Sequence, residues 1–400
     1  MISLEEAQRL ICLQSKCTGI ELLPIEDCIG RILAEDLHAL VSHPPFPRSA
    51  MDGYALSSNT LRDAREDHPV KCSVIYKICA GQPTGRAIAE GEAVRIMTGG
   101  MIPEGADCVV PQEFTDYGEE EVSIYRKAEP GDNYCPEGED FHAGELLAEK
   151  GMRVDSYMIA AAVAAGKESL QVYRRLRAAV ITTGDELCRP GQELKTGQIY
   201  DSNMAYICSR LKELGCELNY VYCAGDNVNR ICQAVMEAGK ESDFIITTGG
   251  VSVGEKDLLP AVMESLHARQ IFHGIRIKPG MPTMFSVYDG IPVLSLSGNP
   301  YSSSAMFELL VKPFLAKSSG ENRNLIEMRT VLAVMAEDYP KKSPVRRFIR
   351  GKYDGSSVWA AVQQRNGQLK AGIGSNCLID IPEGSAELKA GDAVRILYYF

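Results

Sequence analysis

The stretch Phe244-Ile-Ile-Thr-Thr248, which runs directly into Gly249-Gly250-Val251-Ser252-Val253-Gly254-Glu255-Lys256-Asp257, is the most informative part of the chain. Apolar and β-branched residues predict a buried strand, and the glycines that follow predict a sharp turn. Successive glycines let a backbone come close to a ligand. The hydroxyl of Ser252 can also donate a hydrogen bond to an oxyanion. We therefore expect a ligand-binding loop at the end of this strand.

Two other segments of the chain repeat this order of strand, glycine and polar loop. Ala178-Ala-Val-Ile-Thr-Thr183 is followed by Gly184-Asp185-Glu186, and Pro292-Val-Leu-Ser-Leu296 is followed by Ser297-Gly298-Asn299-Pro300. In open α/β sheets, ligands bind beyond the carboxyl ends of the strands. Three such loops side by side would present backbone N–H groups, helix N-termini and carboxylates to one ligand. This favours a phosphorylated molecule held with a metal ion.

The alternation of strand and helix patterns between residues 177 and 315 predicts a mostly parallel sheet with helices on both faces. The first 45 residues are predicted to be helical, beginning with a capping box at Ser3 and Glu6. Residues 54–133 predict a small β-rich domain, and residues 155–166 predict an alanine-rich helix. Strand patterns after Gly320 predict a second small β domain. The fold class is therefore a multidomain α/β protein.

Charge and hydropathy argue against several classes of function. The net charge is −11, with no basic block, which argues against nucleic acid or an anionic membrane as the main partner. Arg346, Arg347 and Arg350 cluster, and we interpret them as a solvated strand face. The longest apolar runs are too short to span a membrane, and the N-terminus does not have the pattern of a signal peptide.

The cysteines and histidines bear on the cellular compartment and on the metal. Thirteen cysteines without C-x-x-C spacing predict reduced thiols in a cytoplasmic protein. Six histidines without metal-ligand spacing argue against a transition-metal site. Oxygen ligands, and hence Mg²⁺, are favoured.

Asp257 has a structural and a functional interpretation. It stands where the next helix is expected to begin, so it could cap that helix or bind a cation. Glu186 and Asp226 are also expected at strand ends. The three carboxylates together favour a metal site.

The same loop matches the nucleophile elbow G-x-S-x-G at Gly250-Val-Ser-Val-Gly254. A serine hydrolase would then need a histidine, for which His267 and His273 are available. Both lie close to the serine in sequence, whereas that fold places its histidine after further strands. The residues between the turn and the next helix also break the pattern, so this is the weaker alternative.

Four further residues also have both a structural and a functional interpretation. Lys278 lies in the rigid turn Ile277-Lys-Pro-Gly-Met-Pro282, where it is either solvated or preorganised to contact an oxyanion. Asp52 and Thr98 lie in glycine-containing motifs that could be simple turns. Asp140 belongs to a pair of acids that could equally be exposed loop charges.

Taken together, these motifs resemble the molybdopterin molybdenumtransferase family (MoeA and the E domain of gephyrin-type proteins). The matching stretches keep the family order and cover nearly the whole chain. They are Ser49–Ala55, Arg95–Gly99, Pro103–Asp107, Gly138–Asp140, Thr183–Leu187, Gly197–Asn203, Gly249–Asp257, Ile277–Gly280 and Ser297–Pro300.

The resemblance implies an elongated subunit of four domains, which forms a homodimer with its active site at the subunit interface. The implied domains are a helical and extended linking domain (residues 1–45 and 137–173), a β-rich domain (46–136), a three-layer α/β/α molybdenum-cofactor-biosynthesis sandwich (174–318) and a C-terminal β domain (319–400). The implied reaction takes adenylylated molybdopterin and molybdate, cleaves the adenylate with Mg²⁺, and releases AMP and molybdenum cofactor. Other molybdenum-cofactor biosynthesis proteins are candidate partners.

The resemblance also implies roles for single residues. The metal ligands are Glu186, Asp226 and Asp257, and the catalytic residues are Glu186, Asp257, Lys278 and Asp52. The substrate-binding residues are Thr98, Asp140, Gly249, Gly250, Ser252, Pro279, Gly298, Asn299, Pro300 and Arg350. Asp52, Thr98 and Asp140 are expected to reach the site from the partner subunit.

The chain departs from the family pattern where an oxyanion is expected. Met281 and Gly274 stand where the family commonly has lysines, and Arg276 could compensate for the second. The family's proline before Gly298 is Ser297 here, and a serine of the last domain is Asn366. Two alternatives are disfavoured: a sandwich protein that only adenylylates molybdopterin, which would not need the two β domains, and a receptor-anchoring scaffold, because nothing in the sequence resembles an additional domain or disordered linker for that role.

Overall fold

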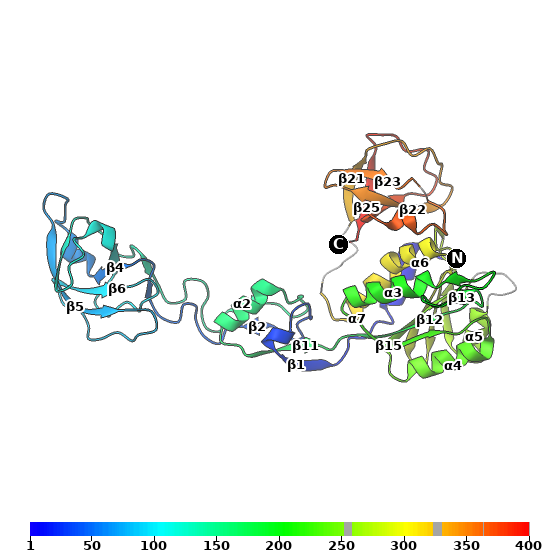
Figure 1. Cartoon of the computed structure of the whole chain (residues 1–400), viewed down its shortest axis with the longest axis horizontal. Helices are drawn as coiled ribbons and strands as arrows, with labels where there is room; N and C mark the ends of the chain where they lie inside the picture. Colours follow the sequence, from blue (N-terminus) through cyan, green and yellow to red (C-terminus); the bar gives the residue numbers. More distant parts are fainter. Residues whose placement is uncertain (252–257, 323–329, 363, 400) are drawn as a thin grey trace.

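The computed structural model describes residues 1–251, 258–322, 330–362 and 364–399, and its shape is elongated (Figure 1). A distal β lobe, which contains β4 (Gly53–Leu56), lies at one end of the molecule. The sandwich and the C-terminal β lobe lie at the other end. A linking region, which contains α2 (Ser156–Ala164), connects them. Across the described ranges, every helix is too short or too polar to cross a membrane.

The sandwich is built on a six-stranded sheet with the order β15-β12-β16-β20-β19-β17. Four neighbouring strands run parallel: β15 (Glu217–Cys223), β12 (Arg177–Thr182), β16 (Phe244–Thr248) and β20 (Ile291–Leu296). The antiparallel edge consists of β19 (Met284–Tyr288) and β17 (Arg269–His273). The predicted, mostly parallel sheet is confirmed, although the sequence did not predict the antiparallel edge.

Helices cover both faces of this sheet, because successive residues of a strand point to opposite sides. Ala178 and Val180 of β12 join one apolar cluster, whereas Ala179 and Ile181 join the other. The first face packs against α1 (Leu4–Cys12), α3 (Ser202–Glu213), α6 (Pro300–Met306), a π-helical turn (Phe307–Val311) and α7 (Lys312–Ser318). The second face packs against α4 (Val228–Gly239) and α5 (Leu259–Ser265). The predicted three-layer α/β/α sandwich is confirmed.

The prediction that the first 45 residues are helical is wrong beyond α1. Ser3 does cap α1, since its Oγ accepts from the Glu6 N–H at 3.1 Å. The chain then becomes extended: β1 (Ile20–Pro24) pairs with β11 (Ser169–Tyr173), and β2 (Leu37–His38) pairs with β10 (Leu146–Ala148). Partners more than a hundred residues away decide these strands, which a local pattern does not reveal. The predicted helix at 155–166 is α2, capped by Asp155.

The distal β lobe and the C-terminal β lobe are both small sheets. The distal sheet has the order β7-β4-β6-β5-β8, with β5 (Val70–Ile78), β6 (Glu92–Ile96), β7 (Cys108–Pro111) and β8 (Glu121–Ile124). The C-terminal sheet has the order β18-β22-β23-β21-β25-β24, with β18 (Ile277–Lys278), β21 (Thr330–Met335), β22 (Arg346–Tyr353), β23 (Ser357–Ala360), β24 (Cys377–Ile381) and β25 (Ala393–Tyr398). Because β18 leaves the sandwich to pair with β22, the C-terminal lobe is hydrogen-bonded directly to the sandwich.

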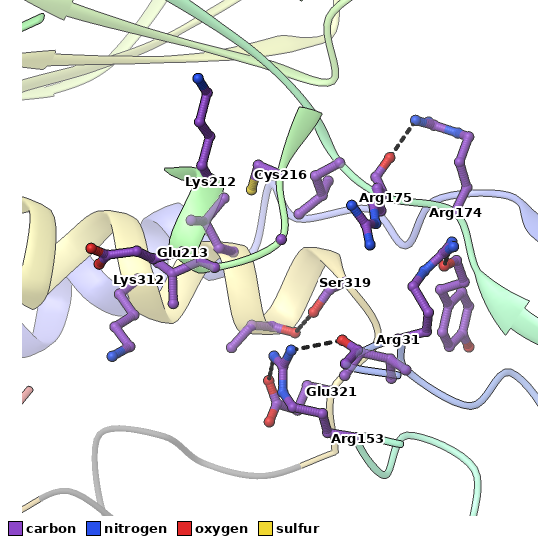
Figure 2. Close-up of a pocket in the computed structure, with 18 of the residues that line it drawn as sticks. Arg31, Arg153, Arg174, Arg175, Lys212, Glu213, Cys216, Lys312, Ser319 and Glu321 are labelled. Carbon is purple, nitrogen blue, oxygen red and sulfur yellow. Dashed lines mark hydrogen bonds and ion pairs between the residues drawn. The ribbon is translucent and has the colours of Figure 1, made fainter. Parts of the chain in front are cut away.

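Ion pairs and backbone hydrogen bonds cross the joint between the linking region and the sandwich (Figure 2). The joint surrounds a cavity of about 260 Å³ that several arginines line. Arg153 pairs with Glu321 at 3.0 Å and donates to Gly30 O at 2.9 Å, and Arg174 pairs with Asp243 at 2.8 Å. These arginines therefore connect segments of the chain to one another.

Candidate functional site

The loops that follow β12, β16 and β20 lie side by side, because these strands are neighbours in the sheet. Together with the loop after β15 they line a cleft of about 800 Å³, at the carboxyl ends of the parallel strands. The candidate residues that line it are Glu186, Asp226, Gly249, Gly250, Gly298, Asn299 and Pro300. The volume is in the range of small-molecule sites.

The floor of this cleft is backbone packed on backbone. Gly249 has a φ of +90°, and a Cβ on it would lie 2.5 Å from Thr183 O. A Cβ on Gly298 would lie 3.3 Å from Gly249 Cα. Only glycine at position 249 allows the loops after β12 and β16 to approach this closely.

Carboxylates line the wall that the loops after β12 and β15 form. Asp226 N–H donates to Asp185 Oδ1 at 3.0 Å, and this bond ties the two loops together. Glu186 folds back over Gly184, where a Cβ would lie 2.5 Å from Glu186 Oε2. Glu186 and Asp226 both line the cleft, whereas Asp185 connects the loops.

Asp257 and Ser252 lie outside the described residues, so two predicted ligands have no observed position. Among the described residues there is no group of three or more Asp, Glu, His or Cys side chains arranged as a metal site. Glu186 and Asp226 are nevertheless hard oxygen donors. Such a pair fits Mg²⁺, which commonly takes one or two carboxylates and completes its shell with waters and substrate phosphates.

Two residues of the cleft have structural contacts that the sequence did not predict. Asp201 is buried, accepts from Thr182 Oγ1 at 2.6 Å and caps α3 through the Met204 N–H at 2.9 Å. Asn203 Nδ2 donates to Gly298 O at 2.7 Å. Both belong to the family-like stretch 197–203, which was the sequence feature that could have identified them as residues of the site. They hold the start of α3 against the ends of β12 and β20.

The start of α6 offers fewer free donors than the sequence suggested. The N–H of Tyr301, in the first turn, donates to Asn366 O of the C-terminal β lobe at 2.9 Å. Asn299 N–H is directed to Ser297 Oγ at 3.3 Å. The C-terminal β lobe therefore closes this side of the cleft.

Lys278, Pro279 and Asn299 line a second cavity of about 300 Å³, which adjoins the cleft at Ser297 and Asn299. Arg347 of β22 lines the same cavity, so a second cation faces it from the C-terminal β lobe. We call it the basic cavity. Met281 lines it where the family commonly has a lysine.

Two expectations about basic residues are corrected. Arg276 does not compensate for Gly274 in this cavity, because it lines a separate one beside Glu5. The cluster of arginines on β22 is not a solvated face: Arg346 pairs with Asp380 at 2.7 Å, and Arg350 is 4% exposed. The guanidinium of Arg350 lies 3.9 Å from the centroid of the Tyr301 ring, and burial lowers its pKa. It lines a cavity with aromatic walls, and its predicted role in substrate binding stays a prediction.

Asp52 and Thr98 are in contact with each other, but in the distal β lobe. Thr98 donates to Asp52 Oδ1 from its N–H at 2.7 Å and from its Oγ1 at 2.6 Å, and these bonds lower the pKa of Asp52. Asp140 lies near the linking region, where its N–H donates to His43 O at 3.0 Å. Within one chain the distal lobe is at the opposite end from the cleft (Figure 1).

The serine-hydrolase alternative has one observed contact that bears on it. His273 Nε2 lies 2.8 Å from Val251 O, so this ring nitrogen is engaged by a backbone carbonyl. Ser252 itself lies outside the described residues, and no triad is seen in the part of the chain that the structure describes.

Comparison with known proteins gives matches along almost the whole chain. Residues 2–166 match the MoeA N-terminal region (domain I and II), residues 179–317 match a probable molybdopterin binding domain, and residues 332–399 match the MoeA C-terminal region (domain IV). The matches therefore include the regions before and after the sandwich domain as well as the sandwich itself.

Molybdopterin molybdenumtransferase of Staphylococcus epidermidis is 34% identical over 400 residues, which cover 99% of this chain and 95% of the relative. The Bacillus subtilis protein of the same name is 34% identical over 405 residues, with 99% and 94% covered. The crystal structure of a molybdopterin biosynthesis MoeA protein from Pyrococcus horikoshii superposes with a TM-score of 0.87 at 33% identity, covering 100% of this chain and 99% of that one. The chain belongs to the MoeA family of molybdopterin molybdenumtransferases and is an enzyme.

Proposed function

We propose that this enzyme inserts molybdenum from molybdate into adenylylated molybdopterin, with Mg²⁺-dependent cleavage of the adenylate and release of AMP. The observation that supports it best is the cleft of about 800 Å³, into which the glycine loops and the carboxylates Glu186 and Asp226 converge. A phosphoanhydride needs close backbone approach and charge compensation, and this cleft offers groups for both.

Each part of the cleft is assigned a task. Gly249 and Gly250 line the cleft, and because they have no Cβ their backbone packs against Thr183, which places the loop after β16 beside the proposed position of the phosphates. Glu186 and Asp226 would hold Mg²⁺, with Asp257 proposed as the third carboxylate from its place in the sequence. When bound, Mg²⁺ supplies positive charge against the phosphate oxygens. The carboxylates fix its position, so that charge in the transition state meets a preorganised site.

The basic cavity is assigned to molybdate. Lys278 and Arg347 face it, and both are local cations in a chain whose net charge is −11. Local cations must hold an oxyanion in this cavity, because the negative net charge of the whole protein repels anions. The cavity adjoins the cleft at Ser297 and Asn299, so an oxyanion in it would lie beside the adenylated substrate. Met281 leaves this site with fewer positive charges than the family pattern has.

We also propose that the active site is completed in a homodimer. Asp52 and Thr98 form a preorganised pair that lies far from the cleft of its own chain (Figure 1). A second copy could bring them, with Asp140, over the cleft. The exposed Tyr157 of α2 and Ile20 and Leu22 of β1 offer apolar surface for such a contact.

The thirteen free thiols fit a reducing cytoplasmic compartment.

The test measures AMP release from adenylylated molybdopterin with Mg²⁺ and molybdate. Glu186→Gln and Asp226→Asn should each lower kcat by about 100-fold or more, because each removes a negatively charged oxygen ligand of the proposed Mg²⁺, whose charge offsets that of the reacting phosphates. Glu241→Gln, at an exposed position of the sandwich away from the cleft, is the matched control and should turn over normally. Full activity of both cleft variants would contradict the assignment.

A further inference from the structure

A third cavity, of about 340 Å³, lies where α3, α6 and the C-terminal β lobe meet. Its walls are mainly aromatic and aliphatic: Tyr206 comes from α3, Tyr301 from α6, and Leu369, Ile373 and Tyr399 from the C-terminal β lobe. Among the described residues that line it, Arg350 alone carries a formal charge. The chemistry of this cavity therefore differs from that of the carboxylate cleft and of the basic cavity.

The walls of this cavity are fixed by their own contacts. Tyr301 OH donates to Phe348 O at 2.8 Å, and the guanidinium of Arg350 stacks on its ring at 3.9 Å. Tyr206 packs edge-on against Phe307, with 6.2 Å between the ring centroids. Rigid aromatic walls of this kind suit a flat ligand, which can stack without ordering the side chains first.

The mouth of the cavity exposes apolar side chains. Ile373 is 84% exposed and Leu369 is 49% exposed, and both belong to the segment of the C-terminal β lobe that faces α6. A flat apolar face bound in the cavity would remove part of this surface from water. A phosphate group would bind less favourably in this cavity than a flat apolar ring, because the single cation, Arg350, is already stacked on Tyr301.

The cavity is continuous with the rest of the site. It shares Asn203, Pro300 and Leu369 with the cleft and Tyr301 with the basic cavity. A ligand whose phosphates lie in the cleft can therefore extend a ring into this cavity without leaving the protein surface.

We propose that this cavity, which we call the ring subsite, binds a fused nitrogen heterocycle of the substrate, and that the C-terminal β lobe thereby contributes to substrate selection. The proposal rests on the proposed function, whose substrate carries two such heterocycles, a pterin and an adenine. Both offer a flat apolar face and a polar edge. The experiment distinguishes the two sources.

The decisive variant is Ile373→Asp, which places a carboxylate at the mouth of the ring subsite on a side chain exposed enough to leave the fold intact. Free pterin and adenosine serve as probes, with pterin fluorescence and calorimetry as the measurements. The variant should bind the preferred probe about tenfold more weakly. Its KM for adenylylated molybdopterin should rise by a similar factor, with kcat within about twofold of the wild-type value.

Val362→Asp is the matched control, since Val362 is fully exposed in the same lobe and does not line the cavity. Tyr206→Leu keeps an apolar side chain but removes the aromatic ring from the wall of the cavity, so it should also lower the affinity for the preferred probe. Pterin binding without adenosine binding assigns the subsite to the pterin, and the reverse assigns it to the adenine.

The two proposals fail in different ways. If the wild-type enzyme releases AMP but Ile373→Asp keeps its KM and probe affinity, the ring subsite is wrong and the proposed function stands. Wild-type protein that binds neither probe at millimolar concentration also overturns the subsite. If no AMP is released while probe binding is lost in Ile373→Asp, the proposed function is wrong and the subsite stands.

Discussion

The C-terminal β lobe and the linking region both join the sandwich, but through interfaces of opposite character. Phe348, Leu378 and Leu397 of the C-terminal β lobe belong to the same apolar cluster as the helices on the first face of the sheet. Beyond α1, which belongs to the core of the sandwich, the linking region has a separate apolar cluster around Leu33. The ion pair of Arg153 with Glu321 and backbone hydrogen bonds cross from this part to the sandwich (Figure 2).

This difference indicates which parts of the molecule act as one body. A shared apolar core resists opening, because separation would expose it to water. The C-terminal β lobe is therefore a fixed wall of the basic cavity and of the ring subsite. A polar joint exchanges its hydrogen bonds with water at low cost, so the linking region and the distal β lobe can reorient more easily.

The largest expected effect comes from the ion network beneath the C-terminal interface. Glu308 is buried in the π-helical turn, where Arg210 Nη2 lies 2.7 Å and Lys312 Nζ lies 3.9 Å from its carboxylate oxygens. Lys312 Nζ also donates to Tyr399 O of the C-terminal β lobe at 2.7 Å. Glu308→Ala should lower the free energy of unfolding by about 3–5 kcal/mol, because it removes the buried carboxylate that offsets the charges of Arg210 and Lys312.

Denaturant unfolding measures this loss, and Glu213→Ala provides the control. Glu213 pairs with the same Arg210, but its side chain is 57% exposed, so its removal should cost less than about 1 kcal/mol. Equal losses in the two variants would show that the C-terminal interface does not depend on the buried network.

A smaller effect is expected at the joint of the linking region. Arg153→Ala removes the pair with Glu321 and the bond to Gly30 O, and should cost about 1–3 kcal/mol of unfolding free energy, because the arginine is partly exposed but the side chain of Glu321 is only 5% exposed. Amide hydrogen exchange should become faster around residues 316–322 and stay unchanged in β22 and β24. Arg9→Ala, which breaks an exposed pair within α1, should leave both regions unchanged. Equal acceleration in the C-terminal sheet would contradict the contrast between the interfaces.

The smallest expected effect concerns the protonation of Asp52 in the distal β lobe. The hydrogen bonds from Thr98 hold its pKa below the ordinary value of 3.8. A depressed carboxyl pKa contributes stability that is present above the unfolded pKa and is lost as the pH falls through the folded pKa. Thr98→Ala should therefore raise the pKa of Asp52 in an NMR titration, and Thr98→Ser, which keeps the hydroxyl, should leave it low. An unchanged pKa in Thr98→Ala would exclude the Thr98 hydroxyl as its cause and leave the Thr98 N–H, which the variant keeps.

Local sequence was a good guide to the sandwich and a poor one to the linking region. The strand at 244–248 is a short apolar run that ends in glycines and is buried along its whole length. The helices around Met204 and Ile231 have helical periodicity, because each buries one face against the sheet. β1 and β2 pair instead with strands that follow more than a hundred residues later. Their short segments carry no periodic signal of their own.

The same contrast holds for the site. The glycine loops and the carboxylates at the strand ends were predictable, because parallel strands bring their carboxyl ends to one edge of the sheet. Arg347 and the wall of the ring subsite that Leu369, Ile373 and Tyr399 form were not, because they come from the C-terminal β lobe, and nothing local in that segment indicates that it docks on α6.

The amino-acid order alone determined that three strands end in glycine loops, and that acidic residues follow them, since backbone geometry and side-chain chemistry are local properties. Only the tertiary structure decided which lobe meets those loops, how Arg350 is buried against Tyr301, and that Asp52 is held away from the cleft of its own chain. Those outcomes depend on burying apolar surface between segments far apart in sequence, and that free energy is a property of the assembled fold.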